Sequence, residues 1–81
     1  MEPSSAFPTL HHFITSGGTI DVGRIDIINC AAVASDADTL WVALTRRRHE
    51  GLIDLLRRLD DTLERCLERN ERVDELHEPA H

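Results

Sequence analysis

The stretch RIDIINCAAVASDADTLWVALT, residues 24–45, decides the fold because it holds the clearest β pattern in the chain. At its start isoleucines alternate with charged residues, and further along both faces are apolar or small, which is typical of a strand buried on both sides. The polar run at residues 35–38 indicates a turn. The sequence therefore predicts a β-hairpin over residues 24–45, with strands at 24–34 and 39–45.

The segment before the hairpin predicts one short helix. Residues 1–7 are expected to form a flexible arm. Pro8 suits the first turn of a helix, and the apolar residues after it are spaced to share one face. We expect this helix over residues 8–16, ended by the two glycines that follow it. Residues 19–23 fit either a short edge strand or an irregular loop, so the sheet has two or three strands.

One long amphipathic helix is predicted for residues 50–77, with a tail at 78–81, because Pro79 stops a helix. Its apolar residues recur at alternating spacings of four and three, which is the heptad pattern of helices that pack on another helix. The positions in this pattern are Leu52, Leu56, Leu59, Leu63, Cys66, Asn70, Val73 and His77. The chain is thus expected to be a single α+β domain over residues 1–81.

The predicted long helix exceeds what the rest of the chain can cover. At about 1.5 Å per residue it spans roughly 42 Å, whereas a compact chain of this length has a radius of gyration of about 12 Å. An uncovered apolar stripe favours association, and a second copy of the chain is the simplest partner. We therefore predict a homodimer whose interface holds Leu59, Leu63, Cys66, Leu67, Asn70, Val73 and Leu76. The alternatives are a helix that frays after Cys66 or bends back within a monomer.

Charged residues define two candidate contact surfaces. Arg46, Arg47 and Arg48 precede the helix N-terminus, where they oppose the helix dipole, and Arg57 and Arg58 extend this patch. Such a patch suits a phosphate, a nucleic-acid backbone or an acidic protein surface; the alternatives are a solubilising cluster or pairing with acidic residues of another copy. An acidic face on the helix suits docking to a basic protein, or is simply solvated: Asp60, Asp61, Glu64, Glu68, Glu71 and Glu75.

No set of residues has the spacing of a catalytic or metal site. Ser16, Thr19 and Cys30 are candidate nucleophiles, but nothing in the sequence pairs any of them with a histidine. The histidines and cysteines lack zinc-ligand spacing, and Cys30 and Cys66 are expected to be small buried hydrophobes. We expect no enzyme activity, no cofactor and no bound metal.

Composition narrows the functional classes further. The chain has 81 residues and a formal net charge of −6, and its basic side chains are all arginine, as in GC-rich bacterial coding. It has no apolar run of about 18 residues and no signal-peptide pattern, so we expect a cytoplasmic protein without membrane contact. Negative net charge disfavours non-specific nucleic-acid binding.

The leading hypothesis is a non-catalytic protein–protein interaction module. It would act as a homodimeric adaptor, regulator or inhibitor, such as an accessory protein of a bacterial mobile element or phage, with a basic protein as a further partner. The alternative is a nucleic-acid-binding regulator that uses the cluster Arg46–Arg48.

Overall fold

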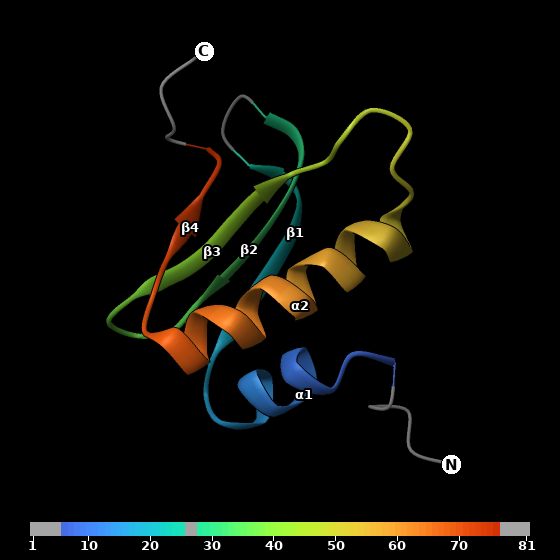
Figure 1. Ribbon diagram of the computed structural model, residues 1–81. Helices are drawn as coiled ribbons and strands as arrows, with labels where there is room; N and C mark the ends of the chain where they lie inside the picture. The colour runs from blue at the N-terminus through green and yellow to red at the C-terminus, as the bar shows by residue number, and fades with distance from the viewer. Residues whose placement is uncertain (1–5, 26–27, 77–81) are drawn as a thin grey trace.

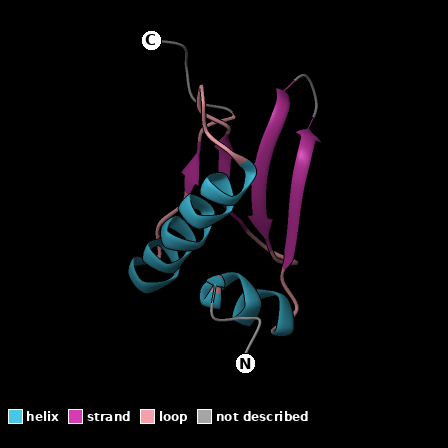
Figure 2. Cartoon of the chain, turned by 90° about the vertical axis from the view of Figure 1, so that its right-hand side faces the viewer, coloured by secondary structure: helices cyan, strands magenta, loops and turns pink. Residues whose placement is uncertain are grey.

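A computed structural model describes residues 6–25 and 28–76. Its elements run in the order α1 (Pro8–Thr15), β1 (Thr19–Ile25), β2 (Ile28–Ser35), β3 (Leu40–Thr45), α2 (Leu52–Arg69) and β4 (Val73–Asp74). Both helices pack on the same face of one sheet (Figures 1 and 2). The α+β class, the short N-terminal helix and the antiparallel hairpin are confirmed.

The sheet has four strands in the order β1-β2-β3-β4. The first three are antiparallel neighbours, whereas β4 pairs with β3 in parallel. The segment 19–23, which the sequence left open, is therefore part of an edge strand. The expected strand start at residue 24 is wrong, because Arg24 and Ile25 belong to β1 and the next strand begins at Ile28. Ile25 and Ile27 alternate with Arg24 and Asp26 up to the start of β2, and no glycine or proline interrupts this stretch, so the pattern does not reveal the reversal.

Asp36 organises the turn between β2 and β3. Its Oδ1 accepts the backbone N–H groups of Asp38 at 2.9 Å and Thr39 at 2.8 Å, and its Oδ2 accepts the Trp41 indole N–H at 2.9 Å. Aspartate favours turns because its side chain can satisfy backbone donors in this way. The carboxylate thereby holds the whole turn in one conformation.

The hydrophobic core lies between the sheet and the two helices. It contains Leu10, Phe13, Ala32, Ala34, Val42, Leu44, Leu55, Leu59, Leu63 and Cys66, with Phe7 packed against it. The expectation of a flexible arm is wrong at Phe7, which also accepts the His11 N–H through its carbonyl at 3.0 Å; residues 1–5 lie outside the described part. The small residues of β2 allow close approach of the helices, because alanine leaves room on the sheet surface.

Helix α2 ends much earlier than the sequence predicted. It stops at Arg69, and Asn70 takes a left-handed conformation with φ 55°. The Cys66 carbonyl accepts the N–H groups of both Asn70 and Glu71, which closes the helix end. The chain then turns back as β4, where Val73 pairs with Val42 of β3. A helix over residues 50–77 is therefore wrong beyond residue 69, while His77 and the tail at 78–81 fall outside the described residues.

Candidate interaction surfaces

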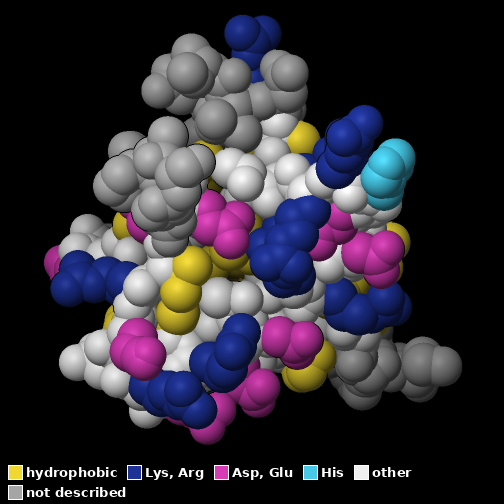
Figure 3. Space-filling view, turned by 45° about the horizontal axis from the view of Figure 1, so that its top comes forward, with side chains coloured by type: hydrophobic (Ala, Val, Ile, Leu, Met, Phe, Trp, Pro, Cys, Tyr) yellow, Lys and Arg dark blue, Asp and Glu magenta, His cyan; other side chains and the backbone are white. Residues whose placement is uncertain are grey.

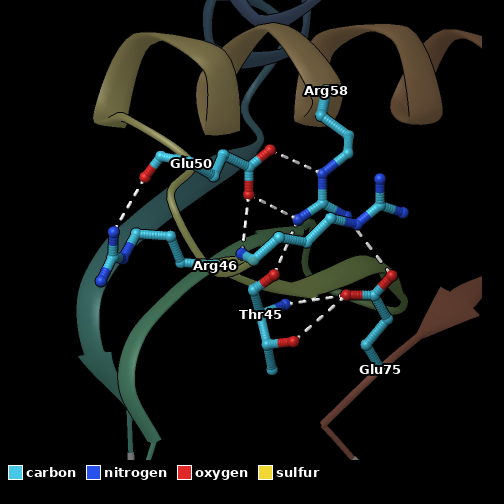
Figure 4. A network of polar contacts seen from close by, with 6 residues as sticks. Thr45, Arg46, Glu50, Arg58 and Glu75 are labelled. Carbon is cyan, nitrogen blue, oxygen red and sulfur yellow. Dashed lines mark hydrogen bonds and ion pairs between the residues drawn. The ribbon is translucent and has the colours of Figure 1, made fainter.

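A polar network centred on Arg58 connects three segments of the chain (Figure 4). The guanidinium of Arg58 donates twice to the Glu50 carboxylate at 2.9 Å, to the Thr45 carbonyl at 2.7 Å and to Glu75 Oε2 at 3.4 Å. Glu75 in turn accepts the Thr45 N–H at 2.9 Å through its other oxygen. Arg58 therefore ties the end of β3, the loop before α2 and the segment after β4 to one another.

Glu50 is the acidic centre of this network. Its side chain is only 11% exposed, and the hydrogen bonds from Arg58 lower the pKa of its carboxyl to about 2, with the backbone N–H of Arg47 adding to the effect. The Arg46 guanidinium donates to the Glu50 carbonyl at 2.9 Å. The network thus fixes the loop backbone from which the arginines 46–48 project.

The loop itself is a tight turn in which the Arg47 carbonyl accepts the Glu50 N–H at 3.0 Å. Its third residue, His49, has φ 68°, which a non-glycine residue adopts at some cost in free energy. Arg46, Arg47 and Arg48 are exposed, and no carboxylate in the described part of the chain pairs with their side chains. We call residues 46–49 the arginine turn; Figure 3 shows basic side chains spread over one face of the molecule with acidic side chains among them.

The other two arginines of the predicted patch have different surroundings. Arg58 is committed to the network and is 17% exposed. Arg57 is exposed and pairs with Asp54 at 3.4 Å on the same helix. The accessible and unpaired part of the predicted anion site therefore reduces to the arginine turn.

The residues of the predicted dimer interface lie mostly inside the chain's own core. Leu59 and Leu63 are fully buried and Cys66 is 2% exposed. Val73 packs against the same core from β4, Leu76 is half-buried, and Asn70 is the helix cap. Leu67 alone of this group is a substantially exposed apolar side chain, at 38%. The projecting apolar half-helix that required a second copy is therefore absent from the described structure.

The residues of the predicted acidic face are likewise partly buried and partly exposed. Asp60 is buried, and its Oδ1 accepts the Leu10 N–H at 2.8 Å, so it caps the N-terminus of α1 from the neighbouring helix. Glu75 belongs to the Arg58 network. The exposed remainder is Asp61, Glu64, Glu68 and Glu71.

The charged residues of α2 are spread unevenly around the helix. At about 100° per residue, Glu64 lies on the same side of the axis as Leu67 and Glu68 lies opposite the buried stripe, whereas Asp61 lies within about 40° of Arg65 on the other side. Arg65 and Arg69 line a cavity beside Val73, on the flank nearer β4. Leu67 lies on the flank nearer α1. Arg65 therefore neighbours Asp61 and Glu68, and Glu64 is the exposed carboxylate of α2 nearest to the flank of Leu67.

An open groove of about 250 Å³ lies on that side, where α1, the β2–β3 turn and the end of α2 meet. We call it the α1 groove; it is lined by His12, Phe13, Ser16, Gly18, Asp36 and Leu67. Phe13 packs so closely on Gly18 that a side chain at position 18 would collide with its ring. Asp36 borders the groove, and hydrogen bonds from the Trp41 indole and two turn amides lower the pKa of its carboxyl. The side chain at this border is therefore a carboxylate.

The sequence did not indicate the α1 groove. Its lining residues come from three segments that are far apart along the chain and meet only through packing. The one local signal was the turn at residues 35–38, which contains Asp36 but gives no sign of what faces it.

A smaller cavity of about 120 Å³ lies on the opposite flank of α2, lined by Thr62, Arg65, Cys66, Arg69, Glu71 and Val73. Burial raises the pKa of the Cys66 thiol, which disfavours the nucleophilic thiolate. Within the described ranges, no three His, Cys, Asp or Glu side chains come together as a metal site. No helix in those ranges is long and apolar enough to cross a membrane.

No known protein family, curated protein or solved structure matches this chain. The two surfaces that the geometry offers are therefore the basis for assigning a function: the α1 groove with its acidic surroundings, and the arginine turn at the other end of α2.

Proposed function

We propose that this chain is a non-catalytic protein–protein interaction module that serves as an adaptor, regulator or inhibitor of another protein. The α1 groove carries the proposal, because it combines the aromatic ring of Phe13 with the exposed Leu67 and the carboxylate of Asp36. Leu67 is 38% exposed, and exposed apolar side chains beside polar ones are common at protein contact sites.

The candidate nucleophiles favour a binding role over catalysis. Ser16 shares the α1 groove with His12 and Asp36, but no hydrogen bond links these three side chains in the described structure. The Asp36 oxygens accept hydrogen bonds from the turn and Trp41, and a Ser–His–Asp triad needs the carboxylate directed at the histidine. Cys66 was not among the candidate nucleophiles, and burial raises the pKa of its thiol, which disfavours the thiolate there as well.

Homodimerisation remains a prediction, although its original argument no longer applies. Leu59, Leu63 and Cys66 are covered by the chain's own strands and helix α1. A dimer would therefore need another surface, and the oligomeric state is best measured together with binding.

The proposal is tested by affinity capture with three versions of the purified chain. Wild type is compared with the double variant Glu64→Lys/Glu68→Lys and with the triple variant Arg46→Ala/Arg47→Ala/Arg48→Ala. We expect to capture a protein partner that, once purified, binds wild type and the triple arginine variant with similar affinity. The same partner should bind the Glu64→Lys/Glu68→Lys variant, which we call the lysine variant, at least roughly tenfold more weakly, because reversed charge repels a basic surface. Absence of any stoichiometric protein partner would contradict the proposed function.

A second candidate function is a nucleic-acid-binding regulator, which the arginine turn favours. Three exposed arginines on a fixed backbone are suited to phosphate contacts, although the chain as a whole is acidic. Binding of a DNA or RNA duplex that falls steeply with salt and disappears in the triple arginine variant would select this function over protein docking. Duplex binding that is unchanged in the triple arginine variant would show that the arginine turn does not cause it.

A further inference from the structure

We propose that the α1 groove receives a long cationic side chain, arginine above all, from a basic segment of a partner protein. This inference rests on the proposed function and names the chemistry of the partner. It follows from the size of the groove, the nature of its walls and the distribution of charge around it.

The size of the groove suits a side chain. Its volume of about 250 Å³ is below the roughly 300–1,000 Å³ of typical small-molecule sites. Phe13, which is 7% exposed, forms an apolar floor, and the exposed part of Leu67 forms a wall. An aliphatic stem can lie against such walls while its charged head remains near water.

Charge complementarity selects a cation. Asp36 borders the groove, and the lowered pKa of its carboxyl keeps it ionised at neutral pH. Glu64 and Glu68 are exposed and precede and follow Leu67 on α2. Arg65 and Arg69 line a different cavity, on the flank of α2 nearer β4. A cationic head group in the groove would thus meet the Asp36 carboxylate, and no arginine is among the described residues that line the groove.

Arginine fits these surroundings better than lysine. Its planar guanidinium can stack on an aromatic ring and can donate several hydrogen bonds to carboxylates in one plane. Phe13 provides the ring, and Asp36 retains acceptor capacity beyond its turn contacts because a carboxylate has about four lone-pair sites.

A second copy of this chain is a poorer occupant than another protein. The arginine turn lies before the first residue of α2, and Arg65 and Arg69 lie on the flank nearer β4, whereas the groove lies near the last turn of α2 on the flank nearer α1. Insertion of one copy's arginine turn into the next copy's groove is a head-to-tail contact, which generates open chains unless a ring closes. The overall charge of −6 also opposes self-association.

The test uses a ten-residue alanine peptide carrying three arginines, and the same peptide with neutral citrulline in their place. Both are titrated into the ¹⁵N-labelled full chain at pH 8, where an unperturbed histidine is neutral. We expect the arginine peptide to shift the amide signals of Phe13, Gly18, Asp36 and Leu67. We expect the citrulline peptide to bind at least roughly fivefold more weakly, as the loss of an ion pair implies.

Variants separate the groove from general attraction to an acidic protein. Leu67→Ala and Glu68→Gln change exposed side chains, so both should fold, and each should weaken arginine-peptide binding by about two- to fivefold. Asp54→Asn removes another exposed carboxylate, near the other end of α2, and is the control, with no change expected.

Two results of the titration would overturn the inference: equal binding of the two peptides, or amide shifts that avoid the groove residues. A third is a shift of the groove signals with protein concentration, in the absence of peptide, that vanishes in the triple arginine variant. This third result would assign the groove to a second copy.

The captured protein partner separates the inference from the proposed function. If that partner binds wild type and the Glu64→Lys/Glu68→Lys variant equally, the inference fails while the proposed function stands. If no protein partner is captured, the proposed function itself fails.

Discussion

Arg58 is the residue that connects the end of β3, the loop before α2 and the segment after β4. Its guanidinium joins Thr45, Glu50 and Glu75, which belong to three separate segments, through hydrogen bonds to four oxygen atoms. Breaking a largely buried pair on one side leaves an uncompensated charge, which costs far more than an exposed pair contributes. The network is therefore a structural element, and it fixes the position of the arginine turn.

Glu50 should make the stability of the fold depend on acid pH. Its pKa falls from 4.5 to about 2 on folding, so its ionised form stabilises the fold above about pH 4.5, and this contribution is lost as the pH falls toward 2. We expect Glu50→Gln to lower the free energy of unfolding at pH 7, and the difference from wild type to shrink between pH 4.5 and 2. Chemical denaturation at several pH values measures this.

The matched control for Glu50→Gln is Glu64→Gln, an exposed glutamate outside the network. It should change the free energy of unfolding by no more than about 0.5 kcal/mol at neutral pH. A Glu50→Gln effect that stays constant from pH 7 to pH 2 would show that the ionised carboxylate is not what Arg58 stabilises.

Asp60 provides a second residue-scale prediction, because it caps α1 from a neighbouring helix. Asp60→Ala removes the acceptor of the Leu10 N–H and should lower the free energy of unfolding by about 0.5–2 kcal/mol, the usual cost of losing an N-cap. Asp61→Ala, at the adjacent exposed position, should change it by less than about 0.5 kcal/mol. Urea denaturation of both variants decides the matter, and equal effects would contradict the capping role.

At the scale of elements, α2 is a helix with one buried side and a defined end. Leu63 and Leu67 both lie in the apolar stripe, yet Leu63 is fully buried and Leu67 is 38% exposed. We expect Leu63→Ala to lower the free energy of unfolding by about 2–5 kcal/mol, and Leu67→Ala by less than about 1 kcal/mol. Urea midpoints of both variants, measured at two protein concentrations tenfold apart, give these values.

Concentration dependence distinguishes the core from a dimer interface in that experiment. If the stripe packs within one chain, the urea midpoints do not move with protein concentration. If Leu63 lies in an obligate dimer interface, the wild-type midpoint rises with concentration and Leu63→Ala reduces that rise.

The apolar spacing predicted the hairpin and α1 because both depend on local patterns that packing retained. It failed at the end of α2, because Val73 lies seven residues after Cys66 and continues the heptad spacing whether the chain is helix or strand. The signal that mattered was Asn70, a residue type that tolerates the left-handed cap conformation. The parallel pairing of β4 with β3 is a tertiary contact that no local pattern encodes.

The candidate sites show the same limit. The exposed cluster Arg46–Arg48 was visible in the sequence as a run of like charge. Arg58 does not extend this cluster because it is paired within the fold, partly with Glu75, which lies seventeen residues away in the sequence. The buried role of Asp60 likewise depends on α1, fifty residues away. The α1 groove had no sequence signal because its floor and its carboxylate come from different elements.

At the scale of the whole molecule, the exposed charges are arranged along α2. The arginine turn lies before its first residue, and its second half carries the exposed carboxylates Asp61, Glu64 and Glu68 together with the exposed Arg65 and Arg69. A partner approaching this chain therefore meets positive charge at the arginine turn and mixed charge along the second half of α2, and this difference steers orientation as well as affinity.

The account depends most on the claim that a basic protein segment docks at the α1 groove. Photo-crosslinking to the captured partner tests this claim directly. One variant carries a benzophenone side chain at position 67, and a matched variant carries it at position 52. Leu67 borders the groove, whereas Leu52, 55% exposed, lies beside the arginine turn. We predict crosslinks from position 67 to a partner peptide containing arginine and none from position 52; crosslinks from position 52 alone would contradict the account.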